Sequence, residues 1–329
     1  MIISEDAPKI FKFRHVALTA LKVAGSGAAV LWLVFTIQWD AFIDKAAGTD
    51  WLRLSIALAV FSLWIWPCAL RWRQIVKSSG YPISLGEATR GYLMGAFFSA
   101  FLPTAKGGDV VRGILLARRR RFSIGGILAT VFAERFIGLA VALFMVFLSS
   151  VLAFSRYSAF KEVFLSASAL ALFLFGLVLV YMNSSFRKFF SRFVHRLPLS
   201  RLQTASDDFA KVLDICFARP LLILSAVGFS FMNQLVMIVS GFLIASAIPS
   251  FDAPWISFPL VIPLNFIAVL LPSIGGYGIR EASFVIFFGW FGVSEEAAVL
   301  FGMLQLLFFW VFSVVGGFVF MKGKNAMSE

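Results

Sequence analysis

A motif rich in Pro and Gly occurs twice in the chain, each time between apolar stretches that are too short to cross a bilayer. Residues 102–112 read LPTAKGGDVVR, and residues 271–280 read LPSIGGYGIR. Each copy holds a helix-breaking Pro, a Gly pair and an Arg just beyond the break. Lipid tolerates such a backbone only where protein or water covers it. The motifs therefore predict two broken helices inside a membrane protein, with breaks at Pro103, Gly107, Gly108, Pro272, Gly275 and Gly276.

The composition leads to the same class of protein. Of the 329 residues, 60% are hydrophobic and 14% are charged, and the mean hydropathy is +0.91. This leaves too little polar surface to coat a soluble globule. The net charge of +12 comes from short clusters of Lys and Arg between apolar segments. Such clusters are typical of the cytoplasmic loops of membrane proteins, so we do not expect nucleic-acid binding.

Six apolar stretches reach the length of about 20 residues that a spanning helix needs. They are residues 17–37, 52–70, 125–152, 163–182, 221–248 and 297–321. The connecting regions rich in Lys and Arg are residues 71–77, 118–121 and 187–219, and the positive-inside rule places them in the cytoplasm. The opposite loops, such as residues 40–50, are acidic or mixed. The sequence therefore predicts that both termini are cytoplasmic.

Each motif lies in a segment whose two flanking regions are predicted on the same side of the membrane, and this side differs between the two motifs. Residues 88–117 are predicted to form a hairpin entering from the cytoplasm, and residues 255–291 one entering from outside. The chain is then an all-α polytopic membrane protein, with about six full transmembrane helices and two oppositely oriented re-entrant hairpins. Its single domain, residues 1–329, divides into an inverted repeat of residues 17–152 and 163–321. Such repeats place a transporter's substrate site near the midplane. The alternative is that the breaks only kink long helices.

Residues 184–219 are predicted to form a cytoplasmic amphipathic connector. Its second part has an apolar face made of Leu202, Phe209, Val212, Leu213 and Cys216. We expect this connector to lie on the cytoplasmic leaflet, with basic residues toward anionic head groups. The alternative is a connector packed on the helix bundle.

Six charged residues lie within or beside apolar segments, where each costs about 2.5 to 3.5 kcal/mol on insertion scales. They are Asp109, Arg112, Glu134, Arg135, Arg280 and Glu281. Asp109 and Arg112 are three residues apart and can share one helix face, so they can pair with each other or with residues of the second half. Adjacent residues diverge on a helix, so Glu134 and Arg135 need different partners. A pair between the halves, such as Glu134 with Arg280, is one option.

These charges suggest an anion site. After each Gly pair a helix can restart, and its N-terminus offers free N–H groups to a phosphate. We expect Arg112, Arg135 and Arg280 to hold the phosphate, while the three carboxylates orient those arginines or respond to protons. The alternative is that the charges only form internal salt bridges. Four carboxamides are expected to bridge helices rather than touch substrate: Asn233, Gln234, Asn265 and Gln305.

Other chemistry has no support in the sequence. The chain has two histidines, and it has no carboxylate pair with metal-ligand spacing, no P-loop and no nucleophile elbow. The sequence therefore offers no candidate catalytic residue. We therefore expect neither a metal nor a cofactor.

Several ordered segments resemble the lysylphosphatidylglycerol synthase transmembrane-region family. These segments are residues 95–112, the AERFIG string at 133–138, residues 271–284 and the RWR string at 71–73. In one member of that family, the bacterial multiple peptide resistance factor, a similar region moves an aminoacylated phosphatidylglycerol between leaflets. The resemblance covers nearly the whole chain, but we expect no soluble synthase domain here.

The resemblance implies a flippase for an anionic lipid in the bacterial inner membrane, with the six charged residues at its site. The lipid stays open, because related stand-alone members look like transporters of other lipids, including polyprenyl-linked or hopanoid-type ones. Two alternatives also stay open: a membrane-embedded transferase acting on a lipid-linked substrate, and a subunit that presents a lipid to a separate enzyme. Partners are membrane lipids, with a homo-oligomer or a lipid-synthesising enzyme as further options.

Overall fold

The computed structural model describes residues 27–28, 30–102, 107–153, single positions between 165 and 176, 200–271 and 275–325. Every regular element within these residues is a helix, which confirms the all-α prediction for this part of the chain. The helices are α2 (Trp39–Ala47), α3 (Trp51–Ser62), α4 (Ile65–Ser78), α5 (Leu85–Phe101), α6 (Gly107–Arg120), α7 (Ile124–Ala153), α10 (Ser200–Phe217), α11 (Pro220–Ala247), α12 (Ser257–Ala268), α13 (Ile279–Gly289) and α14 (Glu295–Asn325).

Four helical segments are long and apolar enough to cross a membrane: Trp51–Ser78, Ile124–Leu152, Pro220–Ala247 and Glu295–Lys322. They correspond to four of the six predicted spans. The first is longer than predicted and consists of α3 and α4, which are separated by a break. Pro67 lies just beyond that break and has no N–H to donate to the carbonyl of Leu63. The other two predicted spans, 17–37 and 163–182, lie largely outside the described residues, so six spans remain a prediction.

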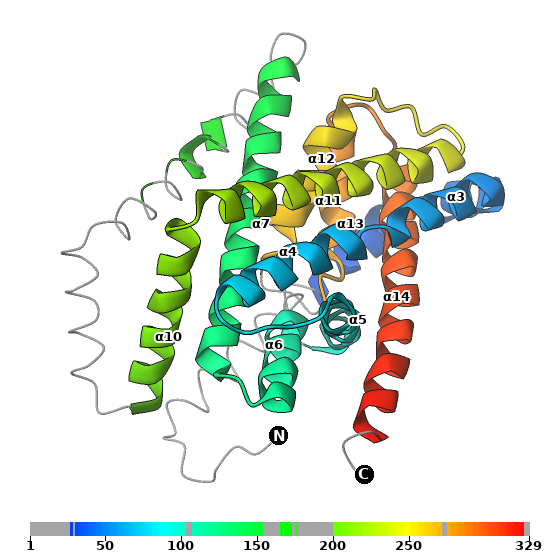
Figure 1. The fold of residues 1–329 in the computed structure, drawn as a ribbon. Helices are drawn as coiled ribbons and strands as arrows, with labels where there is room; N and C mark the ends of the chain where they lie inside the picture. Colours follow the sequence, from blue (N-terminus) through cyan, green and yellow to red (C-terminus); the bar gives the residue numbers. More distant parts are fainter. Residues whose placement is uncertain are drawn as a thin grey trace, which may run out of the picture.

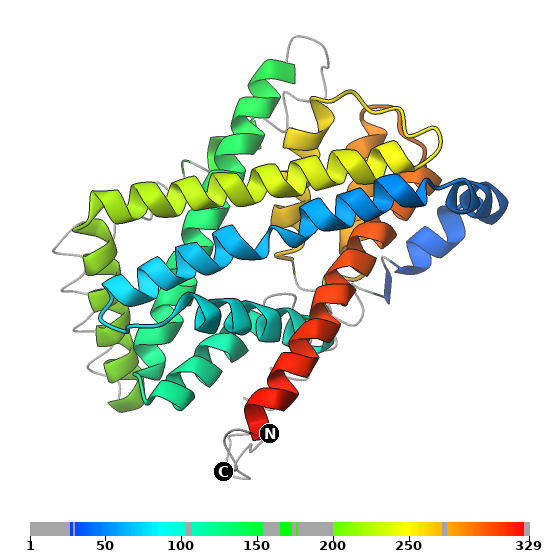
Figure 2. The same cartoon turned by 45° about the vertical axis from the view of Figure 1, so that its right-hand side comes forward.

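The α3–α4 segment and α11 run antiparallel, side by side, through the middle of the molecule (Figures 1 and 2). The backbone N–H of Asp50 donates to the carbonyl of Ala247 at 2.9 Å at one end of this pair. Ser225 donates to Gln74 at 2.8 Å near the other end. In Figure 1 the long helices α7 and α14 run steeply across this pair, α7 in its left part and α14 in its right part.

Two pairs of shorter helices lie at opposite ends of the molecule, with α5–α6 low and α12–α13 high in Figure 1. Each pair packs against the long helix of the other half of the chain, α5 against α14 and α12 against α7. The pairs meet where Tyr277, just before α13, donates its hydroxyl to the carbonyl of Ala100 at 3.2 Å. Their positions match the two predicted hairpins, although re-entry into a bilayer remains a prediction.

The predicted hairpin breaks are partly described. Gly107 begins α6, and the Gly275 and Gly276 pair has left-handed backbone angles of φ 60° and 85°, which glycine adopts without steric cost. Pro103 and Pro272 lie outside the described residues.

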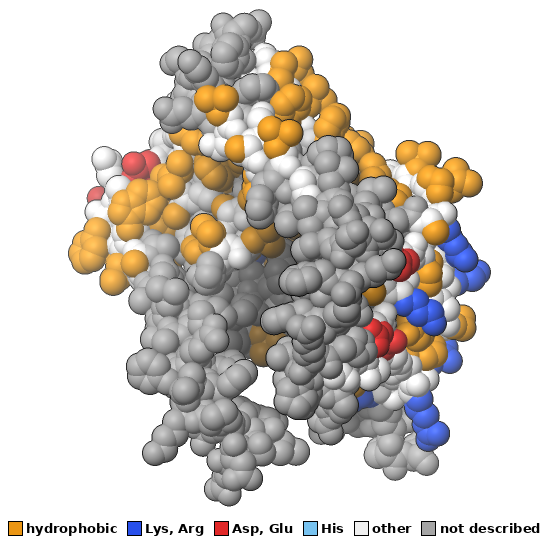
Figure 3. Space-filling model, turned by 90° about the vertical axis from the view of Figure 1, so that its left-hand side faces the viewer, with side chains coloured by type: hydrophobic (Ala, Val, Ile, Leu, Met, Phe, Trp, Pro, Cys, Tyr) orange, Lys and Arg blue, Asp and Glu red, His pale blue; other side chains and the backbone are white. Residues whose placement is uncertain are grey.

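Several exposed basic residues lie at the ends of α4 and α6. Exposed basic residues include Lys77 at the end of α4 and Arg118 and Arg119 at the end of α6, whereas Asp50 and Asp252 are exposed near the start of α3 and before α12. Figure 3 shows hydrophobic side chains over the upper part of one face and Lys and Arg side chains along its right edge. Arg53, however, is exposed beside Asp50, and Asp207 is exposed on α10. The separation of charge is therefore partial, and the orientation in a membrane remains a prediction.

Two elements differ from their predictions. Residues 39–47, expected as part of an acidic loop, form α2, because Phe42 and Ala46 share a helix face that packs against the core. The second part of the connector is the helix α10, as expected. Its apolar face, however, packs on the bundle: Val212 and Cys216 are buried in a cluster with residues of α4, α7 and α11. This contact fits the packed alternative, while the position of α10 relative to a membrane leaflet stays a prediction, and residues 184–199 lie outside the described residues.

Glu87 joins the start of α5 to the end of α6. Its carboxylate caps the backbone N–H of Ser84 at 2.9 Å and accepts two hydrogen bonds from Arg120 at 2.7 and 2.8 Å. The hydrogen bonds from Arg120 lower the pKa of Glu87 from its ordinary value of 4.5 to about 2. The hydrogen bonds of ionised Glu87 therefore stabilise the folded protein at pH values above 4.5, the ordinary pKa of the group. This stabilisation is lost as the pH falls through the folded pKa of about 2.

We therefore expect the wild type to lose thermal stability between about pH 4.5 and about pH 2 because Glu87 becomes protonated. The variant Glu87→Gln has no such titration and should show a smaller loss across the same range. Thermal unfolding in detergent at several pH values tests this, and equal pH profiles for the two proteins would contradict it.

Candidate substrate pocket and buried charge network

Glu134 is the centre of a buried charge network. Its side chain is fully buried on α7. Arg71 of α4 donates to its Oε1 from Nε and Nη2 at 3.2 and 2.8 Å, and Arg112 of α6 donates to its Oε2 at 2.7 Å. The hydroxyl of Tyr92 from α5 also donates to Oε1. One carboxylate therefore connects four helices.

Asp109 is the second carboxylate of the network. Its Oδ1 lies 3.2 Å from Nε of Arg112, one helical turn away, and it also accepts from Nη2 of Arg135. The predicted pairing of Asp109 with Arg112 is confirmed. Glu134 and Arg135 diverge as expected, but the option of pairing Glu134 with Arg280 is wrong, because Arg71 and Arg112 occupy both of the oxygens of Glu134.

The side chain of Arg112 is fully buried. Its guanidinium carbon lies 4.2 Å from the ring centre of Trp72 and 3.8 Å from that of Tyr92, and none of the residue is exposed. Two aromatic faces and two carboxylates therefore surround its charge, while its Nε and Nη1 are buried without a hydrogen-bond partner. Neither Arg112 nor Glu134 lines the pocket described below, and a phosphate contact of Arg112 stays a prediction. Both side chains stabilise the wall behind the pocket.

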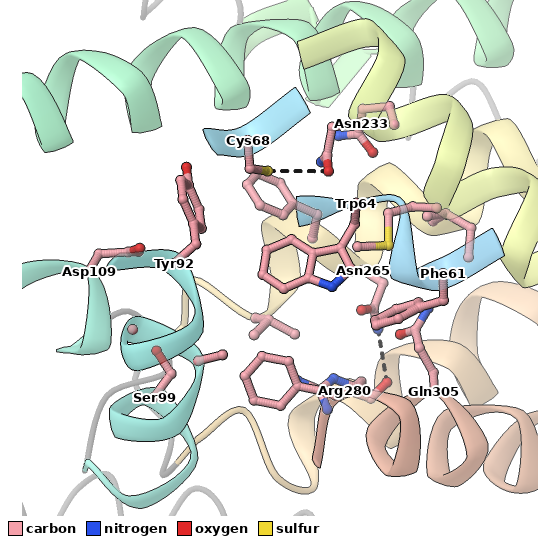
Figure 4. A pocket seen from close by; sticks show the side chains of 18 of the residues that line it. Phe61, Trp64, Cys68, Tyr92, Ser99, Asp109, Asn233, Asn265, Arg280 and Gln305 are labelled. Carbon is pink, nitrogen blue, oxygen red and sulfur yellow. Dashed lines mark hydrogen bonds between the residues drawn. The ribbon is translucent and has the colours of Figure 1, made fainter. Parts of the chain in front are cut away.

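A pocket of about 210 Å³ lies beside this network, between the two helix pairs and the central helices (Figure 4). Asp109 and Tyr92 lie on one side of the close-up, and Arg280, Gln305 and Asn265 on the other. The charged and polar side chains of the lining are Cys68, Tyr92, Ser99, Asp109, Arg135, Asn233, Gln234, Asn265, Arg280 and Gln305. Of the six predicted site residues, the structure brings Asp109, Arg135 and Arg280 to this pocket.

Arg280 has an incompletely satisfied guanidinium. Its backbone carbonyl accepts from Asn265 at 3.0 Å, so α12 fixes the position of the first turn of α13. The guanidinium lies 5.8 Å from the ring centre of Phe309, and its Nη1 is buried without a hydrogen-bond partner. A buried donor of this kind costs free energy unless a ligand or water accepts from it.

Glu281 occupies the helix terminus that the sequence suggested for a phosphate. Its Oε2 accepts from the backbone N–H of Gly278 at 2.8 Å, and only 6% of the residue is exposed. The start of α13 therefore already has a carboxylate, which is favourable beside the positive end of the helix dipole. Glu281 thus caps one N–H group at this terminus, and a phosphate site at the start of α13 stays a prediction.

The sequence analysis missed several residues of the site. Arg71 was interpreted as a cytoplasmic loop cation, but it is buried in α4 and also donates to Ser230 at 2.6 Å. Tyr92 gave no signal of its own. The only available hint for Arg71 was its place in the RWR string of residues 71–73. The carboxamides expected to bridge helices all line the pocket. Two of them combine both roles: Asn265 contacts α13, and Asn233 of α11 accepts from the thiol of Cys68 in α4 at 3.3 Å.

Within the described ranges, no group of three or more His, Cys, Asp or Glu side chains has an arrangement that can hold a metal ion. The chemistry visible at the pocket is that of arginine, carboxylate, carboxamide and aromatic side chains.

Comparison with known proteins identifies the family. A family model described as the lysylphosphatidylglycerol synthase transmembrane region matches residues 19–316. No curated protein sequence matches the chain. The matched range includes the charge network, the pocket and both helix pairs. The chain therefore belongs to the lysylphosphatidylglycerol synthase transmembrane-region family.

Proposed function

We propose that this protein is a lipid flippase or lipid transporter that moves an anionic, phosphate-bearing lipid between the leaflets of the bacterial inner membrane. The observation that carries the proposal is Arg280, whose buried Nη1 has no hydrogen-bond partner and which lines a pocket between apolar helices. A phosphate oxygen is a suitable acceptor for such a donor. Family membership supports a lipid-related membrane function.

The arrangement of helices supports alternating access. The two helix pairs occupy opposite ends of the molecule, and each packs on the long helix of the other half, which is compatible with an inverted repeat. The head group enters the pocket while the acyl chains stay in lipid. Access then switches when one helix pair moves against the other, which requires the contact between Tyr277 and Ala100 to break. Both termini lie in the cytoplasm in this proposal.

Leaflet transfer in proteoliposomes tests the function directly. We expect the wild type to move a labelled anionic lipid, and Arg280→Gln to lower the rate about tenfold or more, because a charged hydrogen bond to the phosphate contributes about 1.5 to 3 kcal/mol. The matched control is Arg53→Gln, which removes an arginine whose side chain is 58% exposed. That control should transport at the wild-type rate.

Other results would contradict the proposal. Equal rates for wild type and Arg280→Gln would exclude Arg280 as the phosphate contact. Product formed from a labelled lipid-linked donor would identify a transferase. Absence of transfer by folded protein, together with copurification of a lipid-synthesising enzyme, would identify a lipid-presenting subunit.

A further inference from the structure

A second cavity, of about 130 Å³, lies between α5 and α14, which are side by side in Figures 1 and 2. Of the described residues, five line it: Phe97 and Ala100 from α5, and Trp310, Ser313 and Val314 from α14. None of them carries a charge, and none lines the candidate substrate pocket. Apolar cavities on the order of 150 Å³ stay dry and take up small apolar molecules. This cavity therefore suits hydrocarbon rather than water or an ion.

Two fixed contacts hold α5 and α14 together at the two ends of this cavity. At one end the helices meet directly, because a Cβ added to Gly316 would lie 1.9 Å from the carbonyl oxygen of Leu93. At the other end Tyr277 connects them. Its hydroxyl accepts from Nε1 of Trp310 at 3.1 Å and donates to the carbonyl of Ala100 at 3.2 Å. The helices therefore cannot close on the cavity without changing one of these contacts.

The inner wall of the cavity is made of small side chains. Ala100 and Ser313 are only 8% and 4% exposed, and neither is large enough to fill the space between the helices. The atoms around an empty cavity lose the packing contacts that they would otherwise make, which lowers the stability of the folded protein. A ligand that fills the space is therefore favoured.

The outer side of the cavity is open and apolar. Trp310 and Val314 are 50% and 56% exposed, and both belong to the segment Glu295–Lys322, which is long and apolar enough to span a membrane. Val311 and Phe318 on the same helix are exposed as well. Lipid chains are the apolar molecules that surround a spanning helix in a bilayer, so they are the ligands that reach this opening.

We propose that this cavity binds the hydrocarbon chain of a membrane lipid, which enters between α5 and α14 from the bilayer. The lining carries no charge, so the site selects the chain and not the head group. The bound chain fills the space between the two fixed contacts and stabilises the packing of α5 on α14. The inference does not depend on the proposed function, because the bound lipid is a component of the surrounding bilayer and not the transported lipid.

Photolabelling of the full-length protein tests this site. The protein is placed in phosphatidylcholine nanodiscs that contain a small fraction of phosphatidylcholine with a diazirine in one acyl chain, and mass spectrometry locates the adducts after irradiation. We expect adducts at Phe97, Trp310 and Val314. They should be about tenfold more frequent than adducts at Leu224 and Leu235, a preference of about 1.4 kcal/mol. These two leucines are 67% and 56% exposed on α11 and line neither cavity, so they report the surrounding lipid.

A pair of variants at one position isolates the role of the empty space. Ser313→Leu puts a larger apolar side chain into the cavity and should lower the adducts at Phe97 and Trp310 about tenfold, the change expected when about two methylene groups lose their burial. Ser313→Ala keeps the space and should be labelled like the wild type. If Ser313→Leu does not fold, the adduct pattern of the wild type still decides the question.

Three results would overturn the inference. Equal labelling of the cavity and of Leu224 would show surrounding lipid only. Unchanged labelling of folded Ser313→Leu would show that the chain does not occupy this space. Labelling of the cavity by a phosphatidylglycerol with the same diazirine chain, but not by the phosphatidylcholine, would assign the cavity to an anionic lipid. Absence of lipid transfer in proteoliposomes would overturn the flippase and leave this inference, whereas absence of cavity adducts would leave the flippase.

Discussion

Replacement of Glu134 by Ala is expected to destabilise the folded protein by about 3 to 5 kcal/mol, the cost of removing one partner from a buried ion pair. The carboxylate accepts from Arg71 and Arg112, and it is fully buried. Its removal leaves two guanidinium groups without their shared counter-ion. Glu134→Gln retains an acceptor oxygen but no charge, so it should lose less stability than Glu134→Ala.

Denaturation of the purified protein in mixed detergent micelles measures this effect. The matched control is Arg53→Gln, because its ion pair with Asp50 has side chains that are 58% and 44% exposed. Exposed pairs contribute about 0 to 1 kcal/mol. A loss for Glu134→Ala as small as that of the control would show that the network does not stabilise the fold.

Two glycines at helix contacts are expected to tolerate no side chain. An added Cβ would lie 1.9 Å from the carbonyl oxygen of Gly95 at Gly108, and 1.9 Å from that of Leu93 at Gly316. The obstacle in each case is backbone, which no rotamer change can remove, so α5 must separate from α6 or from α14. We expect Gly108→Ala and Gly316→Ala each to lose about 3 kcal/mol, the upper end for overpacking.

Gly228 in α11 provides the control for these glycines. No atom lies within 4 Å of a Cβ built there, and the residue is inside a helix. Gly228→Ala should therefore gain up to about 1 kcal/mol from reduced backbone entropy. The same denaturation assay measures all three variants. Stability of Gly108→Ala or Gly316→Ala at the level of Gly228→Ala would show that these helices do not approach so closely.

Local patterns in the sequence predicted the elements that depend on neighbouring residues. Long apolar runs identified α7, α11 and α14 because a spanning helix satisfies its own backbone hydrogen bonds, whatever its neighbours are. The pair of Asp109 with Arg112 followed from helical spacing alone. The family resemblance likewise rested on short ordered strings, and the family match confirms it.

The partners of the other buried charges depended on packing between distant segments. Arg71 and Glu134 are 63 residues apart, and no local pattern distinguishes this pair from a pair of Glu134 with Arg280. The same limit applies to α10. Its sequence pattern fits packing on lipid as well as packing on the bundle, and the structure shows its apolar face beside Ile75 and Ala129.

The sequence by itself determined that this chain is a helical membrane protein of a known family, with charged residues where charge is expensive. Only the tertiary structure decided which charges balance one another and which reach the pocket. The physical reason is that hydrophobic burial depends on composition and helical period, which are local. Ion pairing depends on distances of a few ångströms between helices, and these are set only when the helices pack. Arg112 and Arg280 therefore look equivalent in the two sequence motifs, yet the first is enclosed by carboxylates and aromatic rings and the second faces the pocket.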